Sequence, residues 1–305
     1  MRSIRHQVLA LLCTLFAVSL LGGVFAAAQS TDAEKENRAK QYFNEGVKAK
    51  QEGKTAEAIL AYQGAITLMP DYVDAHINLG GIYFEQEKFD EALKEFKAVT
   101  DKDPKNLDGL VNLGRVQYRM TRYQEAEAAF KAALALKTDD PDILRELGKT
   151  YYYLKNYTEA VNVITKCHTA GSGDNLSWYM LGMSQGKGGD TAKAIASLQK
   201  SIELQPKYYE SRSALGSIYL AQEKYPQAAA QFKAALEAAP TRYRASYNYA
   251  IAMEYAHPNN VTDNVANWED FIRRAKNNPQ ARNDVQVAQE RVDALKKQKA
   301  ATGLE

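Results

Sequence analysis

The residues best suited to covalent chemistry are Cys167 and His168, which are adjacent in the sequence. A thiol next to an imidazole could provide a nucleophile and its general base. Neighbouring residues of an α-helix point about 100° apart, however, so the two side chains would not face each other on a helix. No residue pattern supplies the third group that would orient the base. We therefore expect Cys167 to be a small core residue, and an enzyme that uses its thiol is the least favoured function.

Metal binding and phosphate binding also lack their usual patterns. Beyond the N-terminal segment the histidines are His76, His168 and His257, which are far apart in the sequence. Neither HExxH nor CxxC occurs, and these are spacings that bring metal ligands together. The glycines of QGKGGDTAKA at 185–194 do not follow the GxxxxGK[ST] order of a phosphate-binding loop. We predict no metal, no cofactor and no catalytic residue.

Recognition of another protein is the chemistry that the sequence favours. Aromatic and arginine side chains are the usual anchors of protein interfaces, and here aromatic and cationic residues are interleaved. The predicted partner-binding surface consists of Phe84, Arg115, Tyr118, Arg145, Lys149, Tyr152, Tyr179 and Met183. These residues are widely spaced along the chain, so only a regular fold can bring them to one face.

That regularity comes from a glycine that recurs every 34 residues. A leucine precedes it in five of the six repeats, and an alanine follows it by twelve residues in all six. Residues four before, one before, at and three after the glycine fall on one stripe of a helix. Short polar turns such as EQEKF separate the two helices that each repeat is expected to form. The glycines are Gly46, Gly80, Gly114, Gly148, Gly182 and Gly216, with Ala250 in the next position.

This pattern resembles the tetratricopeptide repeat family, whose consensus is W-x2-L-G-x2-Y, then A-x3-F, then P. Six full repeats cover residues 39–242, although the first has Glu45 for the leucine and the third has its tyrosine one place late, at Tyr118. The third and fourth repeats end in Thr138 and Ser172 without the proline. The resemblance implies an all-α fold, an α-solenoid of stacked helix-turn-helix repeats. It also implies a right-handed superhelix whose concave groove, lined by the first helix of each repeat, holds an extended peptide or a partner helix.

The predicted partner-binding surface occupies the repeat positions three before, one after and four after the glycine. These positions lie about a hundred degrees or more from the core stripe, on the face that the resemblance assigns to the groove. Alternatively, the tyrosines only buttress neighbouring repeats within the groove wall. Some members of the family grip a C-terminal carboxylate with lysines, arginines and asparagines. That mode is not expected here, because acids occupy several of the corresponding positions, namely Asp74, Asp108, Asp142 and Glu146.

The C-terminal part departs from the repeat pattern. Residues 243–279 are interpreted as a degenerate seventh repeat with an enlarged turn at HPNNVTDN, residues 257–264. Residues 280–305 are predicted to form a capping helix and tail, because one narrow apolar stripe lies on an otherwise charged helix. The stripe consists of Val285, Ala288, Val292 and Leu295.

The N-terminal segment, 1–28, has the order of a secretory signal peptide: two arginines, an apolar run and a final group of alanines. Residues 29–38 are then a short leader. Cleavage after Ala28 would remove Arg2 and Arg5 and no acid, leaving 37 basic and 37 acidic residues from the original 39 and 37. A neutral mature chain argues against a nucleic acid, or a membrane surface, held by bulk charge. Membrane association is expected only if the apolar run is uncleaved.

We therefore expect a non-enzymatic, exported adaptor or scaffold of the cell envelope, in the periplasm or outside the cell. Its partner would be a protein or peptide held in the concave groove. The resemblance to exported bacterial members of the family adds secretion, pilus biogenesis and polysaccharide export as candidate processes. A membrane-tethered assembly factor for these processes is the alternative if the N-terminal helix is uncleaved.

Overall fold

The computed structural model describes residues 31–169 and 173–302. The predicted signal peptide, 1–28, lies outside the described residues. Over the described ranges the chain forms fifteen α-helices and one short 3-10 helix, with no β-strand among them. The all-α fold class is therefore confirmed. Within these ranges, no helix is both long and apolar enough to cross a bilayer.

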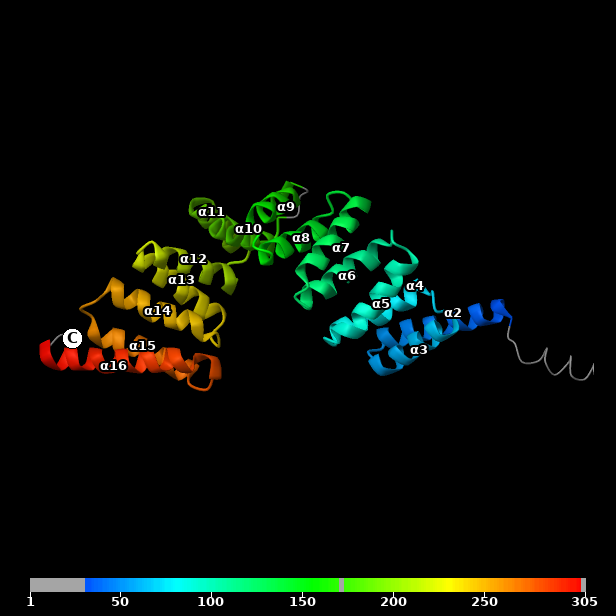
Figure 1. Cartoon of the computed structure of the whole chain (residues 1–305). Helices are drawn as coiled ribbons and strands as arrows, with labels where there is room; N and C mark the ends of the chain where they lie inside the picture. Colours follow the sequence, from blue (N-terminus) through cyan, green and yellow to red (C-terminus); the bar gives the residue numbers. More distant parts are fainter. Residues whose placement is uncertain (1–30, 170–172, 303–305) are drawn as a thin grey trace, which may run out of the picture. The chain divides into compact units, whose positions relative to one another are not determined.

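The chain divides into two compact units, Met1–Thr121 and Arg122–Glu305. Within each unit a helix packs against the helix that follows it, which is the arrangement of an α-solenoid of helical repeats (Figure 1). The helices of the first unit are α2 (Asp32–Gln51), α3 (Thr55–Leu68), α4 (Val73–Glu85), α5 (Phe89–Lys102) and α6 (Leu107–Arg119). Those of the second unit are α7 (Tyr123–Leu136), α8 (Pro141–Tyr153), α9 (Tyr157–Thr169), α10 (Asn175–Lys187), α11 (Thr191–Leu204), α12 (Tyr209–Ala221), α13 (Tyr225–Ala238), α14 (Tyr243–Ala256), α15 (Val261–Ala275), η1 (Pro279–Ala281) and α16 (Arg282–Thr302).

The recurring glycines lie where the two helices of a pair approach most closely. A Cβ atom built on Gly148 would lie 2.4 Å from Cγ1 of Ile164, far inside van der Waals contact. Five glycines each face, in this way, the large side chain that follows sixteen residues later. The pairs are Gly46 with Tyr62, Gly80 with Phe96, Gly148 with Ile164, Gly182 with Leu198, and Gly216 with Phe232. Glycine at this repeat position is therefore a packing requirement, because the helices can come this close only where one side chain is a hydrogen atom.

The turn after the first helix of a pair contains one residue in the left-handed region. Its φ lies between 58° and 93° at six positions, each seven residues after a recurring glycine. Glycine adopts this conformation without steric cost, whereas other residues lose roughly 1–2 kcal/mol. Only two of the six are glycine; the residues are Gly53, Glu87, Thr121, Lys155, Gly189 and Glu223.

Cationic side chains bond to the proline carbonyls that end three of the repeats, and in two of these, His76 and Arg212, the cation has the same repeat position; the third is Arg274, which donates to the oxygen of Pro240. In the first unit His76 places Nδ1 2.6 Å from Oε2 of Glu95 and Nε2 2.8 Å from the oxygen of Pro70. A ring that bonds two acceptors at once carries a proton on both nitrogens. Burial opposes this charge, but the bonds to Glu95 and Pro70 outweigh it and raise the pKa of His76. In the second unit Arg212 has the same repeat position and donates from Nε to the oxygen of Pro206 at 2.6 Å.

The last helices of the second unit share a hydrophobic core. Val261, Trp268 and Phe271 of α15 belong to it. Three residues of the predicted stripe on α16 are buried in the same core, and the fourth packs against it; in order along the helix the four are Val285, Ala288, Val292 and Leu295. The helix α16 therefore covers the apolar face of α15.

A buried carboxylate ties α14 to both of these helices. Glu254, whose side chain is 11% exposed, accepts a hydrogen bond from Nε1 of Trp268 at 2.8 Å. Its other oxygen accepts from Nη2 of Arg291 on α16. Because a buried charge is costly unless it is paired, these two donors hold the three helices together.

The turn at HPNNVTDN is shorter than the sequence indicates. The helix α14 ends at Ala256 and α15 begins at Val261, so the turn has four residues, whereas the turn between α12 and α13 has three. The side chain of Asn260 accepts a hydrogen bond from the backbone N–H of Asp263 and so caps α15. Val261 is fully buried and is the first residue of α15, so the second half of the predicted turn, residues 261–264, belongs to the helix.

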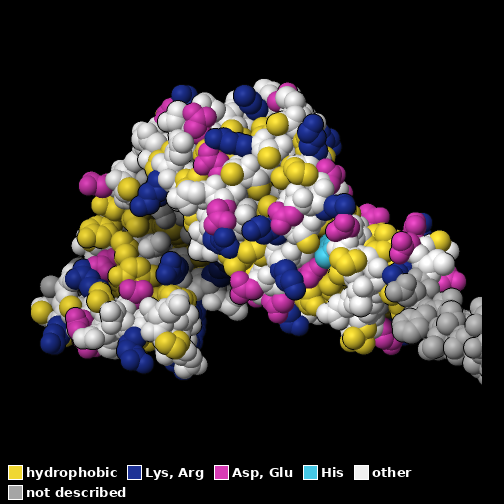
Figure 2. Space-filling model, turned by 45° about the vertical axis from the view of Figure 1, so that its right-hand side comes forward, with side chains coloured by type: hydrophobic (Ala, Val, Ile, Leu, Met, Phe, Trp, Pro, Cys, Tyr) yellow, Lys and Arg dark blue, Asp and Glu magenta, His cyan; other side chains and the backbone are white. Residues whose placement is uncertain are grey.

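Charged side chains of both signs are interspersed over the face shown in Figure 2, and neither sign gathers into a large field. This distribution agrees with the formal net charge of +2 over the whole sequence.

Candidate functional site

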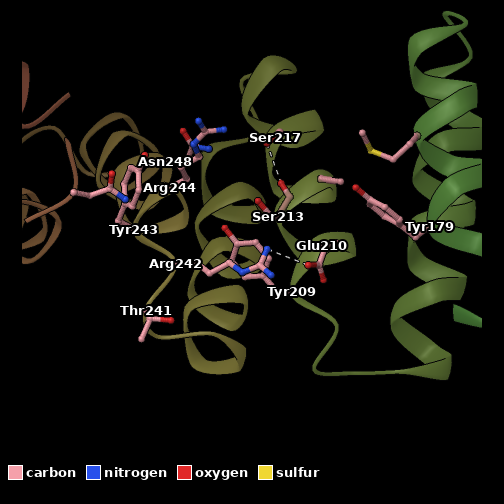
Figure 3. A pocket seen from close by; sticks show the side chains of 13 residues that line it. Tyr179, Tyr209, Glu210, Ser213, Ser217, Thr241, Arg242, Tyr243, Arg244 and Asn248 are labelled. Atoms are coloured by element: carbon pink, nitrogen blue, oxygen red, sulfur yellow. Dashed lines mark hydrogen bonds and ion pairs between the residues drawn. The ribbon is translucent and has the colours of Figure 1, made fainter. Parts of the chain in front are cut away.

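The second unit contains a hollow of about 600 Å³ between the first helices of successive pairs. Its walls come from α10, α12 and α14, together with the turn before α14 and Asn278, which precedes η1. Figure 3 shows the Tyr179 side chain extending from α10 toward α12, across the hollow from the residues of α14. The hollow is open to solvent on one side and has the size of a site for a few residues of peptide.

Aromatic rings form much of the wall. Tyr179 packs edge-to-face against Tyr208, with ring centroids 5.7 Å apart. Burial raises the pKa of Tyr179, and the neighbouring tyrosines Tyr152 and Tyr208 add to this shift, so its hydroxyl stays neutral. Tyr209 lies under the guanidinium of Arg242, 4.7 Å from ring centroid to Cζ. A partner would therefore meet flat aromatic surfaces, which contribute large contact areas at low conformational cost.

Polar groups in the hollow are partly paired with one another. Arg242 forms an ion pair with Glu210 at 3.1 Å (Figure 3). The hydroxyl of Ser217 donates to the backbone oxygen of Ser213 at 2.9 Å. Arg244 also lines the hollow, is exposed, and has none of the ion pairs found in the described part of the chain. It is thus available for a carboxylate from outside.

A second hollow of about 460 Å³ adjoins the first and is less polar. The two share Met183, Ala214 and Ser217, so they form one continuous depression. We call it the α10–α14 groove, defined by the residues that line either hollow. Beyond the shared residues, the second hollow is lined by Gly182, Gly186, Lys187, Thr191, Ile218, Ala221 and Gln222.

Two residues of the predicted partner-binding surface, Tyr179 and Met183, line this groove. Three others lie on α8 of the same unit. There Arg145 pairs with Asp142 at 2.5 Å and Asp174 at 3.1 Å, while Lys149 pairs with Glu146 at 2.6 Å. The two cations of the predicted surface on α8 are thus neutralised by carboxylates, which their repeat positions did not reveal.

The third of these residues, Tyr152, contacts two other tyrosines. Its ring lies 5.4 Å from that of Tyr153 and 5.8 Å from that of Tyr157. Burial, together with the nearby phenols, raises its pKa. This packing agrees with the alternative that a tyrosine at this position buttresses the groove wall.

The remaining predicted residues belong to the first unit. Phe84 lies on α4, 5.7 Å from the ring of Phe89, with the Arg119 guanidinium 5.6 Å from its ring centroid. Arg115 and Tyr118 lie on α6, three residues apart, and both are half-buried. Because the predicted surface is divided between two units, its role as one binding surface stays a prediction.

Several groove residues were missed by the sequence analysis. Glu210 and Arg244 each lie six residues before the repeat glycine position, which is outside the three positions assigned to the groove. Tyr209 and Arg242 lie at a helix start and in the turn before a helix. The sequence contained one signal for these groove residues. At the repeat position of Glu210, repeats 2 to 4 have an acid, whereas the seventh repeat has Arg244.

The thiol considered for catalysis is inaccessible. Cys167 has no exposed surface, and its Sγ donates to the oxygen of Pro141 at 3.3 Å. Burial raises the pKa of the thiol, which keeps it protonated and poorly nucleophilic. His168 turns to Ser177 instead, 3.0 Å from Nε2 to Oγ. Among the described residues, no group of three or more His, Cys, Asp or Glu side chains could hold a metal ion.

Comparison with known families gives a consistent match. One model of the tetratricopeptide repeat matches residues 49–113 and 83–128, and another matches 111–166, 179–243 and 213–254. Together they span more than half of the chain. A search of curated proteins gave no significant match.

Solved structures of similar fold include pilF of Pseudomonas aeruginosa, at 16% identity and a TM-score of 0.61, over 72% of this chain and 97% of that one. MamA matches at 22% identity and a TM-score of 0.52, over 56% of this chain and 93% of that one. YrrB, described as a tetratricopeptide repeat (TPR) protein with an unusual peptide-binding site, matches at 22% identity and a TM-score of 0.50. The match covers 63% of this chain and 97% of that one. At these identities the likeness shows the fold alone.

Proposed function

The chain belongs to the tetratricopeptide repeat family, and on this premise we propose that it is a non-enzymatic scaffold that holds a partner peptide in the α10–α14 groove. The observation that carries this proposal is the groove itself, which is continuous and lined by aromatic and polar side chains. YrrB, a protein of similar fold, is described as having a peptide-binding site. That description supports a peptide as the partner.

The geometry suits an extended segment that crosses the first helices of the array. The rings of Tyr179 and Tyr209 line the hollow and can contact apolar or proline side chains of the segment. The hydroxyls of Ser213 and Ser217 and the amide of Asn248 can bond to its backbone, which an extended chain leaves unpaired. Small residues on α12 let the segment approach the helix backbone closely.

Substitution of Ala214 by arginine tests this proposal. Ala214 lines both hollows, so a long side chain there would fill the groove where its two parts meet. The same repeat position holds Glu146 and Met180 in other repeats, so the fold accommodates a large residue there. The matched control is Ala196→Arg, at an exposed position of α11 that lines neither hollow.

The measurement is capture of partners by the exported protein after crosslinking in cells of the native host. We expect Ala214→Arg to lose a partner that wild type and Ala196→Arg both retain, with equal helix content in all three. Equal capture of that partner by Ala214→Arg would place the binding surface elsewhere. The identity of the partner would also discriminate among envelope assembly, secretion, pilus biogenesis and polysaccharide export.

We further propose export, with loss of residues 1–28, so that the scaffold works in the cell envelope or outside the cell. The support is the order of charged, apolar and small residues in that segment. Mass spectrometry of the protein from its native host should find Gln29 at the N-terminus. A protein that keeps the apolar run and fractionates with membranes would instead be the membrane-tethered assembly factor.

A further inference from the structure

The two ends of the α10–α14 groove carry positive charge that no acid among the described residues neutralises. Arg244 lies at the α14 end, and Lys187 lies at the other end, in the last turn of α10. Both side chains are exposed, and neither takes part in an ion pair within the described ranges. Of the described residues that line the groove, Glu210 is the only acid, and it is paired with Arg242. The groove therefore has two cations to offer to a partner.

The centre of the groove is lined by small and apolar side chains together with Ser217. Met183 and Ala214 line both hollows, and Ile218 and Ala221 continue this surface along α12. A methionine side chain adapts its shape to different apolar groups. Charged groups of a partner would be desolvated here without a counter-charge, which is unfavourable. The centre thus selects an apolar side chain, while the ends select acids.

The separation of the two cations sets the length of the segment. Arg244 lies six residues before the repeat glycine position and Lys187 five residues after it, so they differ by eleven residues along the helix direction, or about 17 Å at 1.5 Å per residue. Two helix spacings of roughly 10 Å each separate α10 from α14. The two components combine to about 26 Å, which an extended chain spans with about eight residues.

We propose that the partner of this groove is an extended segment of about eight residues with an acidic side chain near each end and an apolar side chain at its centre. The acids pair with Arg244 and Lys187, and the apolar side chain lies on Met183 and Ala214. This inference rests on the proposed peptide-binding function of the groove and adds the chemistry of the peptide.

A selection from random peptides tests the proposed function and the inferred chemistry of the peptide separately. The mature protein, from Gln29, is used to select from a phage library of random twelve-residue peptides, and each selected peptide is tested again on Ala214→Arg and Ala196→Arg. Peptides that bind wild type and Ala196→Arg but not Ala214→Arg depend on the groove. If none is found, both the proposed function and this inference are overturned.

The chemistry of the groove-dependent peptides then decides the inference alone. We expect them to share two acids about seven positions apart with an apolar residue between them. Groove-dependent peptides that are basic, or that have no recurring acid, would overturn this inference and leave the proposed function standing.

The roles of the two cations are measured with one synthetic peptide from that selection. Arg244→Gln and Lys187→Gln should each raise its Kd about threefold, and together about tenfold, because exposed charge pairs contribute modestly and distant sites add. The matched control is Lys233→Gln, at an exposed position of α13 outside the groove, which should leave Kd unchanged. Unchanged affinity in the double variant, or an equal loss in the control, would contradict the assignment.

Discussion

Replacement of His76 tests how the first unit is held together. We expect His76→Leu to destabilise α4 and α5, because it removes both hydrogen bonds of the imidazolium. Glu95 would keep a carboxylate that is only 13% exposed in the wild type, and the carbonyl of Pro70 would lose its donor. His76→Arg should be tolerated, since Arg212 makes the equivalent bond in the second unit.

The size of the effect follows from the geometry. The 2.6 Å bond to Glu95 is charge-assisted and contributes about 2 kcal/mol, and the 2.8 Å bond to Pro70 contributes about 1 kcal/mol. Both groups of the ion pair are largely buried, so solvent screens them little. We expect His76→Leu to lower the free energy of local unfolding by about 3 kcal/mol at pH 6.

The contribution of His76 also depends on pH. Its folded pKa is raised above the ordinary value of 6.5, so the unfolded chain releases the proton first as pH rises. The stabilisation is complete below pH 6.5 and is lost as pH rises through the folded pKa. Wild type should therefore be less stable in α4 and α5 at pH 9 than at pH 6, whereas His76→Arg should lose this dependence because arginine stays charged.

Native-state hydrogen exchange with mass spectrometry measures these local free energies, after correction for the intrinsic exchange rate at each pH. Peptides from α12 and α13 are the internal control, because Arg212 holds the same repeat position there. The reasoning is refuted if α4 and α5 show no greater pH dependence than α12 and α13, or if His76→Arg retains it.

Three further predictions concern other parts of the chain. Truncation after Asn278 removes α16 and bares the core on α15, so we expect aggregation or a lower Tm; a monodisperse truncated protein with unchanged melting would contradict this. Glu254→Gln leaves Arg291 without its carboxylate and should lower the free energy of unfolding by about 1–2 kcal/mol, seen in a denaturant titration. Maleimide should label Cys167 in guanidinium but hardly at all in the folded protein at pH 7, because the thiol is buried and its pKa is raised; rapid labelling would mean that the helices α8 and α9 open easily.

The helix pairs could be predicted from the sequence because their determinant is strict. A glycine and a large side chain sixteen residues later must meet, as Gly148 and Ile164 do, so the spacing tolerates little variation. The His76 network could not be predicted in the same way. The sequence places His76 on the core stripe, but its partners come from the next helix and the preceding turn, and only the packed repeat brings them within hydrogen-bond distance.

The groove was predicted only in part, because the repeat pattern does not contain the orientation of its charged side chains. Tyr179 and Met183 follow from their repeat positions. The charges of Arg145 and Lys149 were expected to face a partner, yet their nearest acids are one helical turn away and pair with them. Whether a cation turns to its own helix or into a groove depends on its rotamer and on neighbouring helices, which the repeat pattern does not contain.

Substitution of the left-handed turn residues could make the array more rigid without altering the residues that line its groove. Glu87, Thr121, Lys155 and Glu223 each hold a conformation that glycine holds with less strain, and none of them lines the α10–α14 groove. The stability of a repeat array is roughly the sum of the stabilities of its repeats and their interfaces. A substitution at any of these four positions would therefore change the stability of its own repeat independently of the others. Evolution could thus tighten or loosen single repeats, and with them the ease of local fraying, while the recognition surface stays the same.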